Sequence, residues 1–238
     1  MEDLIKIYLS PSSQPENKYA AGNTNEQEQC RKIAVKCSEA LKRCGRFDPL
    51  VGLANSMYSR VEESNAWGAK SHIPIHTNAH NKKVAGFRGF CYSVSGEGFK
   101  LLSAIEDAVA PITPGTSDGL SARPDLYEIK ASDAPCAYLE LGFHDNPEEA
   151  QFIIDHTEDL AEAICKGVCK HHGVKYVAPA EQSTEKPVEN PAPAKPMYRV
   201  FGADGKQTGA FQVEAYAFNE VKKQLLVGGS ARITLSDK

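Results

Sequence analysis

The chain has no long apolar run and no excess of basic residues. None of its stretches approaches the roughly 20 apolar residues that a membrane span requires. Its net charge of −4, from 27 Lys and Arg against 31 Asp and Glu, argues against general nucleic-acid binding, which needs a basic face. The segment Met1–Lys6 lacks the basic and apolar regions of a signal peptide. We therefore expect no nucleic acid and no membrane as partners, and synthesis in the cytoplasm.

The seven cysteines lack zinc-finger spacing and are odd in number. Cys30, Cys37 and Cys44 recur every seven residues among apolar residues, which predicts small core fillers on one helix face. Cys165 and Cys169 also share a helix face, just before a pair of histidines. That arrangement permits a metal site, but a core helix with a polar end explains it more simply. A reduced cytosolic protein fits these cysteines better than a disulfide scaffold.

A proline-rich segment divides the chain. Residues 178–196 contain five prolines and almost no large apolar side chain, which predicts a semi-rigid linker. The linker separates a first domain, residues 1–177, from a small C-terminal module, residues 197–238. The sequence of the module predicts a strand, a Gly-rich turn, a second strand, a helix (215–226) and a third strand, which is an α+β pattern. At about 40 residues it is marginal for independent folding, so self-association or docking is a hypothesis for it.

The first domain alternates strand and helix signals. Strands are expected at 5–9, 73–76, 86–94 and 137–143, and helices at 25–44, 57–69, 97–109 and 147–172, with a break near His156. Thr24 and Asn25, followed by Gln27 and Glu28, predict a capping box at the start of the first helix, and Gly45 ends it. Strands separated by helices predict an α/β domain, a mixed sheet flanked by helices.

One histidine follows an apolar run in a way typical of a site. In the segment Pro74–Asn78, His76 ends a predicted buried strand and small polar residues follow it. Ligands are held at that open end of a sheet, although a lone histidine there is more often a hydrogen-bonded structural residue. Two acidic residues support the interpretation of His76 as a site residue. Glu26 opens the first helix, where a first-turn acid is also simply favoured by the dipole, and Glu140 lies in an apolar strand, where pairing with a basic residue is the alternative.

In order and spacing, these segments resemble the zinc-dependent N-acetylmuramoyl-L-alanine amidases of the type 3 group. The resemblance covers roughly residues 4–177, and it looks closest to phage endolysins of Gram-positive hosts. It rests on five ordered segments: Lys6-Ile7-Tyr8-Leu9-Ser10-Pro11, Asn25-Glu26, the run from Arg60 through Trp67 to Ala79, Gly86-Phe87-Arg88-Gly89-Phe90, and Pro135-Cys136-Ala137-Tyr138-Leu139-Glu140-Leu141-Gly142-Phe143-His144-Asp145-Asn146.

The resemblance implies a zinc cofactor and assigns roles to three residues. Glu26 and His76 correspond to zinc ligands, and Glu140 to the catalytic carboxylate. Zinc with an open coordination position activates water and polarises the scissile carbonyl. A nearby carboxylate then moves the water proton to the leaving amine. Burial of Glu140 in an apolar strand suits this role, because burial raises the pKa of a carboxyl group toward the working pH.

The chain departs from the family at the first zinc ligand. The family has a histidine in the turn after the first strand, but here Ser13 or Gln14 occupies that place. Gln14 offers a carbonyl oxygen, a weak zinc ligand. His144, four residues after Glu140, is the other tentative third ligand, and His80 is a further option.

The substrate implied by the resemblance is bacterial peptidoglycan. The scissile amide joins N-acetylmuramic acid to L-alanine, and Asn78, Arg88 and Tyr127 are candidate substrate contacts. The C-terminal module after the linker is expected to bind cell wall and keep the enzyme near its polymer. Without a signal peptide, a phage endolysin made in the host cytoplasm or a mother-cell lysis enzyme would each act on the wall after release, and we favour the phage endolysin. Two alternatives remain: a non-catalytic peptidoglycan-binding protein on an amidase fold, and a zinc peptidase acting on the stem peptide.

Overall fold

A computed structural model describes residues 3–54, 56–116, 119–179, 197–202, 207–211 and 231–236. The chain divides into two compact units, residues 1–180 and 181–238. The division falls within the predicted proline-rich linker. Each unit is described by itself below.

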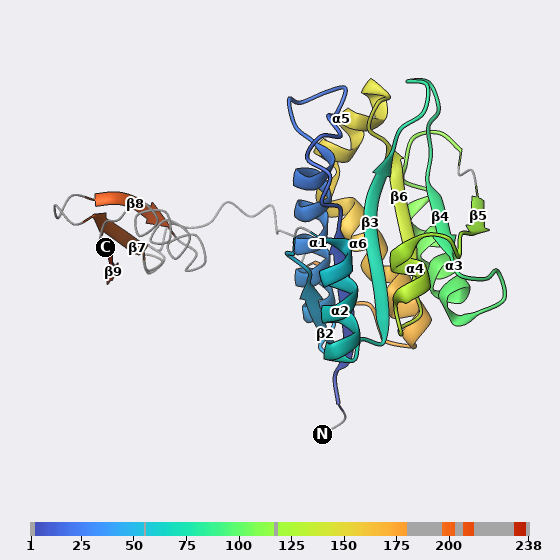
Figure 1. Cartoon of the computed structure of the whole chain (residues 1–238), viewed down its shortest axis with the longest axis horizontal. Coiled ribbons are helices and arrows are strands. Elements are labelled where there is room, and N and C mark those ends of the chain that lie inside the picture. The colour runs from blue at the N-terminus through green and yellow to red at the C-terminus, as the bar shows by residue number, and fades with distance from the viewer. Residues whose placement is uncertain are drawn as a thin grey trace, which may run out of the picture. The chain divides into compact units, whose positions relative to one another are not determined.

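The first unit is built on a six-stranded mixed sheet (Figure 1). Its order is β2-β1-β3-β6-β4-β5. Four pairs of neighbours run parallel and one pair, β4 with β6, runs antiparallel. The strands are β1 (Ile5–Pro11), β2 (Phe47–Val51), β3 (Ser71–Asn78), β4 (Arg88–Cys91), β5 (Gly119–Ala122) and β6 (Tyr138–Phe143). The predicted fold class of this domain, α/β with a mixed sheet flanked by helices, is confirmed.

Helices cover both faces of the sheet (Figure 1). On one face α1 and α3 each pack against α6, while on the other α2 packs against α4. The helices are α1 (Glu26–Arg43), α2 (Met57–Trp67), α3 (Glu97–Val109), α4 (Tyr127–Ala131), α5 (Pro147–Asp155) and α6 (Thr157–His172). This makes a three-layer domain in which the sheet separates two different environments.

Alternation along the strands gives the two faces of the sheet different chemistry. Successive side chains of a strand point to opposite faces. In β3, Ile73 and Ile75 are fully buried in the hydrophobic core with residues of α1, α3 and α6. The alternate residues His72 and His76 point to the other face, where α2 and α4 lie. The sheet therefore has an apolar face that stabilises the fold and a polar face available for chemistry.

Local signals account for several helix boundaries. Asn25 caps α1 by accepting a hydrogen bond from the backbone N–H of Glu28 at 3.0 Å, and Gly45 follows the helix with φ +73°. The predicted break in the last helix occurs at His156, which separates α5 from α6.

The sequence patterns did not predict three elements of the first unit. β2 contains Asp48 and Pro49, which are rare in strands, but it lies at the sheet edge, where proline is tolerated. β5 lies at the opposite edge and has four residues without apolar alternation. α4 has five residues, too few for a helical period to show.

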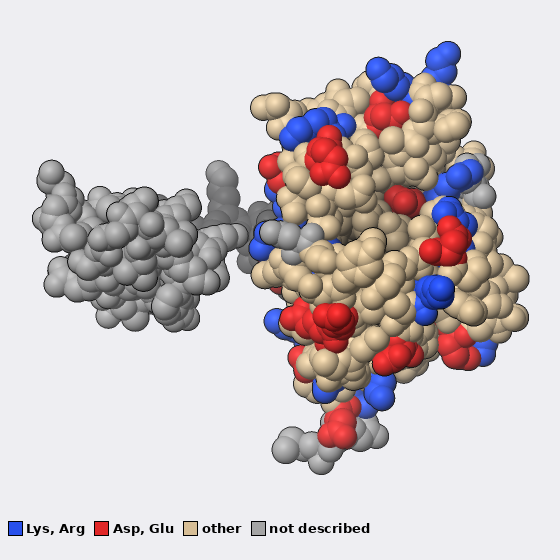
Figure 2. All heavy atoms as spheres, viewed as in Figure 1, with Lys and Arg blue, Asp and Glu red and all other residues tan. Residues whose placement is uncertain are grey.

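Charged side chains are interspersed over the face of the first unit in Figure 2, with Lys and Arg next to Asp and Glu. Lys36, for example, lies 2.9 Å from a carboxylate oxygen of Glu158, and Lys170 lies 2.7 Å from one of Asp107. In the part of the chain that the structure describes, no helix has the length and apolarity needed to cross a membrane.

The second unit contains a three-stranded antiparallel sheet with the order β8-β7-β9. Its strands are β7 (Met197–Gly202), β8 (Gln207–Phe211) and β9 (Ala231–Ser236). These correspond to the three strands expected from the sequence. The expected turn at 203–206, the expected helix at 215–226 and most of the linker lie outside the described residues.

Candidate active site

His76 and Glu26 form the centre of the site, at the carboxyl end of β3 and the start of α1. His76 lies near the carboxyl end of β3, and its Nδ1 lies 2.9 Å from Oε1 of Glu26. Both side chains are buried, with relative exposures of 8% and 1%. Tyr138 stacks on the His76 ring with centroids 4.7 Å apart. The structure therefore brings together the two predicted metal ligands and fixes the plane of the imidazole.

Glu26 is held as a carboxylate by its neighbours. Its Oε2 accepts a hydrogen bond from Nδ2 of Asn17 at 2.6 Å, and its Oε1 accepts one from the backbone N–H of Thr77 at 3.3 Å. Burial alone would raise the pKa of Glu26, but its bonds with His76 and Asn17 outweigh burial and hold the pKa below its ordinary value. For His76 burial acts to lower the pKa, yet the hydrogen bond to Glu26 and nearby carboxylates leave it raised.

The loop between β1 and α1 brings Gln14 to the same place. The backbone N–H of Glu26 donates to the carbonyl of Asn17 at 2.9 Å, which folds the loop back on the start of α1. Nε2 of Gln14 then lies 3.4 Å from Nδ1 of His76, and its Oε1 accepts from Asn17 at 3.0 Å. The side-chain amide of Gln14 is thus in contact with both the histidine and the network that holds Glu26.

His144, the other predicted third ligand, is held elsewhere. Its Nδ1 lies 3.1 Å from both the carbonyl oxygen and the hydroxyl of Thr77. Its ring stacks on Tyr19 with centroids 5.6 Å apart. Because Thr77 follows His76 in the strand, its side chain points to the opposite face. His80 is exposed, and its backbone N–H donates to Asp145.

Glu140 lies directly beside His76 on the neighbouring strand. The two residues pair in register between β3 and β6, and Arg88 of β4 pairs with Glu140 from the other side. Burial raises the pKa of Glu140 to about 7, and the charges of His76 and Arg88 oppose this only in part. Oε2 of Glu140 is buried and accepts no hydrogen bond from any described residue. A buried carboxylate oxygen without a partner next to a histidine and a second acid is typical of a functional group.

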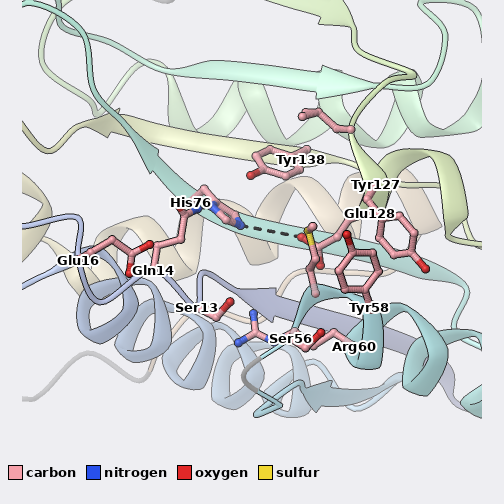
Figure 3. Close-up of a pocket in the computed structure, with 12 residues that line it drawn as sticks. Ser13, Gln14, Glu16, Ser56, Tyr58, Arg60, His76, Tyr127, Glu128 and Tyr138 are labelled. Carbon is pink, nitrogen blue, oxygen red and sulfur yellow. Dashed lines mark hydrogen bonds and ion pairs between the residues drawn. The ribbon is translucent and has the colours of Figure 1, made fainter.

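The structure adds a buried carboxylate that the sequence did not reveal, Glu128 of α4. Its Oε1 accepts from Oγ of Ser10 at 2.5 Å and lies 3.4 Å from Nε2 of His72, while its Oε2 lies 3.9 Å from Nε2 of His76 (Figure 3). Burial acts to raise its pKa, but the bond with His72 and the charge of His76 leave the pKa lowered. The short helix gave no pattern that could have singled out Glu128.

A pocket of about 530 Å³ opens beside the His76 ring (Figure 3). Tyr58 of α2 and Tyr127 of α4 meet edge to face at its wall, with centroids 4.4 Å apart. Its lining residues are Ser13, Gln14, Glu16, Ser56, Met57, Tyr58, Arg60, His76, Leu126, Tyr127, Glu128 and Tyr138. Of the predicted substrate contacts, Tyr127 lines this pocket. Asn78 and Arg88 line a different one, of about 240 Å³.

The sequence is similar to that of a known amidase over part of its length. The chain is 27% identical over 121 residues to the germination-specific N-acetylmuramoyl-L-alanine amidase of Bacillus subtilis (strain 168). That match covers 50% of this chain and 51% of the relative, so the chain spans about half the length of the curated relative it matches.

Solved structures share the fold of the first unit. The catalytic domain of CwlV, an N-acetylmuramoyl-L-alanine amidase from Bacillus (Paenibacillus) polymyxa var. colistinus, has a TM-score of 0.65 at 17% identity and covers 73% of this chain and 100% of its own. An N-acetylmuramoyl-L-alanine amidase from Clostridium difficile 630 has a TM-score of 0.63 at 21% identity, over 73% of this chain and 100% of its own. The catalytic domain of the CD27L endolysin, which targets Clostridia difficile, has a TM-score of 0.59 at 21% identity, over 70% and 97%. At these identities the likeness establishes the fold.

The family is settled by a match of the sequence itself. The Amidase_3 model, described as N-acetylmuramoyl-L-alanine amidase, matches residues 9–170, more than half of the chain. This range contains Glu26, His76 and Glu140, the three residues that the fold brings together near the carboxyl end of β3. The chain therefore belongs to the Amidase_3 family of N-acetylmuramoyl-L-alanine amidases.

Proposed function

We propose that this chain is a zinc-dependent hydrolase that cleaves the amide between N-acetylmuramic acid and L-alanine in peptidoglycan. The observation that carries the proposal is the carboxylate of Glu140, which pairs in register with His76 of the Glu26–His76 pair and whose buried Oε2 accepts no hydrogen bond from any described residue. Family membership supports the choice of the amide bond. The test is product analysis on purified walls, where an amidase exposes a new N-terminal L-alanine and leaves the glycan intact.

The residues present fit a zinc ion. Glu26 and His76 supply a carboxylate oxygen and an imidazole nitrogen, both ordinary zinc donors. The third donor would be the side-chain oxygen of Gln14, which would exchange its hydrogen bond with Asn17 for the ion as the amide turns its oxygen toward His76. The unpartnered oxygen of Glu140 lies next to this donor set without being needed in it. When bound, zinc would supply a Lewis acid for the scissile carbonyl and lower the pKa of a water.

Glu140 is the group that moves protons. A carboxyl group with a pKa of about 7 can accept a proton from the attacking water and then donate it to the leaving amine at neutral pH. The stack of Tyr138 on His76 and the bond of Asn17 to Glu26 keep the neighbouring groups fixed while this happens. Arg88, in register with Glu140, contributes positive charge beside the carboxylate.

The pocket beside His76 is the proposed site for the substrate. Tyr58, Tyr127 and Tyr138 line it, and aromatic rings offer apolar faces with polar edges that suit a sugar or a lactyl-peptide. Arg60 lines the same pocket and donates to the carbonyl oxygens of Ala54 and Pro11, so it supports the wall. The neighbouring pocket with Asn78 and Arg88 would take a second part of the polymer.

Gln14 is proposed as the third ligand because its amide contacts His76, whereas His144 is held at Thr77 and Tyr19. We expect Gln14→Ala to weaken zinc binding by about 10–100-fold, no more than the loss of a supporting group, because an amide oxygen is a weak zinc donor and the two stronger donors remain. Gln14→His should bind zinc at least as tightly as wild type, because imidazole is a better zinc donor than an amide. Competition with a chromophoric chelator measures both affinities. His144→Ala is the control, and weaker binding by that variant alone would make His144 the ligand instead.

Glu128 is proposed to orient His76 from the side of Nε2. Carboxylates that contact the free nitrogen of a ligating histidine fix its tautomer and ring orientation. We expect Glu128→Gln to lower zinc affinity by about 10–100-fold while the chain keeps its helical circular dichroism. Glu97→Gln, which changes an exposed carboxylate paired with Lys100, is the matched control. Equal zinc affinities for wild type and Glu128→Gln would remove Glu128 from the site.

The biological setting proposed for this activity is lysis of a Gram-positive host by a phage endolysin. The division into a hydrolase unit and a small second unit suits an enzyme that is tethered to an insoluble wall. On this proposal the chain is made in the host cytoplasm and reaches the wall after release. Purified chain added to walls of Gram-positive bacteria should sediment with them and lyse them. Failure to sediment with the walls would count against wall binding by residues 197–238. Self-association of the purified chain is a separate question, and sedimentation velocity would detect it.

A second candidate function is a non-catalytic peptidoglycan-binding protein. The observation that favours it is the absence of a histidine at Ser13 and Gln14, where the family has its first zinc ligand. Such a protein would bind walls without stoichiometric zinc and release no product. A zinc peptidase would bind zinc but release new termini within the stem peptide rather than at L-alanine. Zinc content and product analysis together distinguish the three.

A further inference from the structure

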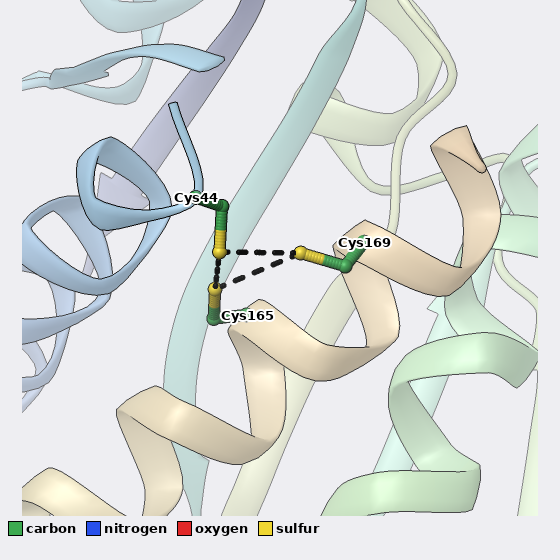
Figure 4. A group of neighbouring side chains, drawn as sticks. All are labelled: Cys44, Cys165 and Cys169. Carbon is green, nitrogen blue, oxygen red and sulfur yellow. Dashed lines mark hydrogen bonds between the residues drawn. The ribbon is translucent and has the colours of Figure 1, made fainter. Parts of the chain in front are cut away.

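Three thiols from two helices meet in the core, away from the proposed active site. Cys44 caps the C-terminal end of α1, and Cys165 and Cys169 lie one turn apart on α6. The sulfur of Cys44 lies 3.8 Å from that of Cys165 and 3.6 Å from that of Cys169, and the latter two lie 4.0 Å apart (Figure 4). We call these three residues the thiol cluster.

The cluster differs from the metal site that the sequence permitted. The histidines that follow Cys169 do not complete it, because His172 instead contacts the hydroxyl of Ser71 at 2.9 Å. The third thiol comes from α1, 121 residues before Cys165. All seven cysteines of the chain are described and reduced, and among the described residues these three have ligand atoms close enough together to hold one metal ion.

The geometry suits one soft metal ion. Three thiolates bound at about 2.3 Å, as in zinc thiolate sites, lie about 3.8–4.0 Å from each other, close to the distances in the cluster. Thiolate sulfur selects soft ions such as Cu(I), or zinc. A closed structural zinc site has four protein ligands, and the cluster offers three. Cu(I) is satisfied by three sulfur donors, so it matches the cluster better.

The cluster is buried but lies beneath a short covering segment. Cys44 keeps a relative exposure of 8%, while Cys165 and Cys169 have 0% and 1%. The backbone N–H of Val177 donates to the sulfur of Cys44 at 3.4 Å, and Arg43 donates to the carbonyl of Val177 at 2.9 Å. Displacing this segment, which follows α6, would give a metal ion access without opening the core.

We propose that Cys44, Cys165 and Cys169 form a binding site for a soft, thiophilic metal ion, with Cu(I) as the matched ion. As three metal–sulfur bonds form, the three thiols release their protons to solvent and the ion keeps its oxidation state. Because α1 has 18 residues and spans roughly 27 Å, this site and Glu26 lie at opposite ends of one helix. The proposal is independent of the amidase function.

Proton competition follows from burial of the cluster. Burial raises the pKa of Cys169 to about 12 and raises that of Cys165 as well. The metal-free thiols of Cys165 and Cys169 are therefore protonated at neutral pH, and the ion must displace those protons. Affinity for Cu(I) is expected to increase with pH, as for other thiolate sites.

The test uses the reduced, full-length chain without oxygen, with Cu(I) supplied from a chromophoric chelator. We expect one equivalent of Cu(I) to transfer to wild type and its X-ray absorption spectrum to show three sulfur neighbours. Cys169→Ala should lower the affinity by more than about 100-fold, beyond the usual effect of a supporting group. Cys136→Ala removes a buried thiol outside the cluster and is the matched control.

Two results would overturn the proposal. One is equal Cu(I) affinity for wild type and Cys169→Ala, which would mean that other thiols bind the ion. The other is failure of wild type to take Cu(I) from the chelator, which would make the cluster three packed core thiols only. If Cys169→Ala does not fold by circular dichroism, Cys44→Ala at the helix end replaces it. The absorption spectrum of wild type decides the coordination without any variant.

Discussion

Glu140→Gln should reduce the rate of wall hydrolysis by about 10²–10⁴-fold, the usual contribution of a general acid–base group. The substitution keeps the shape of the side chain but removes its ability to accept the proton of the attacking water. Zinc content should stay at the wild-type level, because Glu140 is not among the proposed zinc ligands Glu26, His76 and Gln14. Rates are measured as release of N-terminal L-alanine from purified peptidoglycan. Glu158→Gln, on an exposed carboxylate, is the control.

The melting temperature of Glu140→Gln shows whether Glu140 has a structural role in addition to a catalytic one. The pKa of Glu140 is raised to about 7 in the folded chain, above its value in an unfolded chain. A raised carboxyl pKa means that ionisation destabilises the fold, and this penalty grows as pH rises above the unfolded pKa and is complete above the folded one. At pH values above the folded pKa of Glu140, metal-free Glu140→Gln should therefore melt at the same temperature as wild type or at a higher one. A large loss of stability there would make Glu140 a structural residue.

His76→Ala should remove both zinc and activity. Zinc sites in hydrolases use three protein ligands, and in the proposed set His76 supplies the imidazole beside Glu26 and Gln14. Loss of the imidazole leaves one carboxylate and the weak amide donor, so we expect no stoichiometric zinc and a rate at the uncatalysed background, a loss at least as large as that in Glu140→Gln. Metal analysis after gel filtration and the same L-alanine assay measure the two effects.

The control for His76→Ala is His156→Ala. His156 is exposed at the junction of α5 and α6 and pairs with Asp159 at 2.7 Å, so its loss should change neither zinc nor rate. Because Tyr138 and Glu26 pack on His76, the variant is first compared with wild type by circular dichroism. A folded His76→Ala chain that keeps one zinc would place the metal somewhere else.

Much of the fold follows from signals that are local in sequence. Asn25 as a helix cap, Gly45 as a helix end and the alternation of His72, Ile73, Ile75 and His76 each depend on a few neighbouring residues. Their structural consequences are therefore visible without knowing the fold. The edge strand β2 is different, because its Asp48 and Pro49 oppose the strand pattern, and only pairing with β1 makes it a strand.

The site was predictable where it follows strand and helix ends, and not where it depends on tertiary contacts. His76 and Glu140 lie on strands whose apolar patterns are clear, and their register makes them neighbours. Glu128 lies in a five-residue helix and reaches the site only because α4 packs over the sheet. The choice between Gln14 and His144 needed the path of the loop after β1, which no periodicity describes.

The most direct measurement of the central claim is zinc content together with product analysis for the wild-type chain. The account predicts about one zinc per chain, retained through gel filtration, and release of N-terminal L-alanine from intact glycan strands. A chain that binds walls but holds no zinc and releases no L-alanine would contradict it. In that case the side chains at Ser13 and Gln14 would have failed to replace the family's histidine, and the polar face of the sheet would serve binding only.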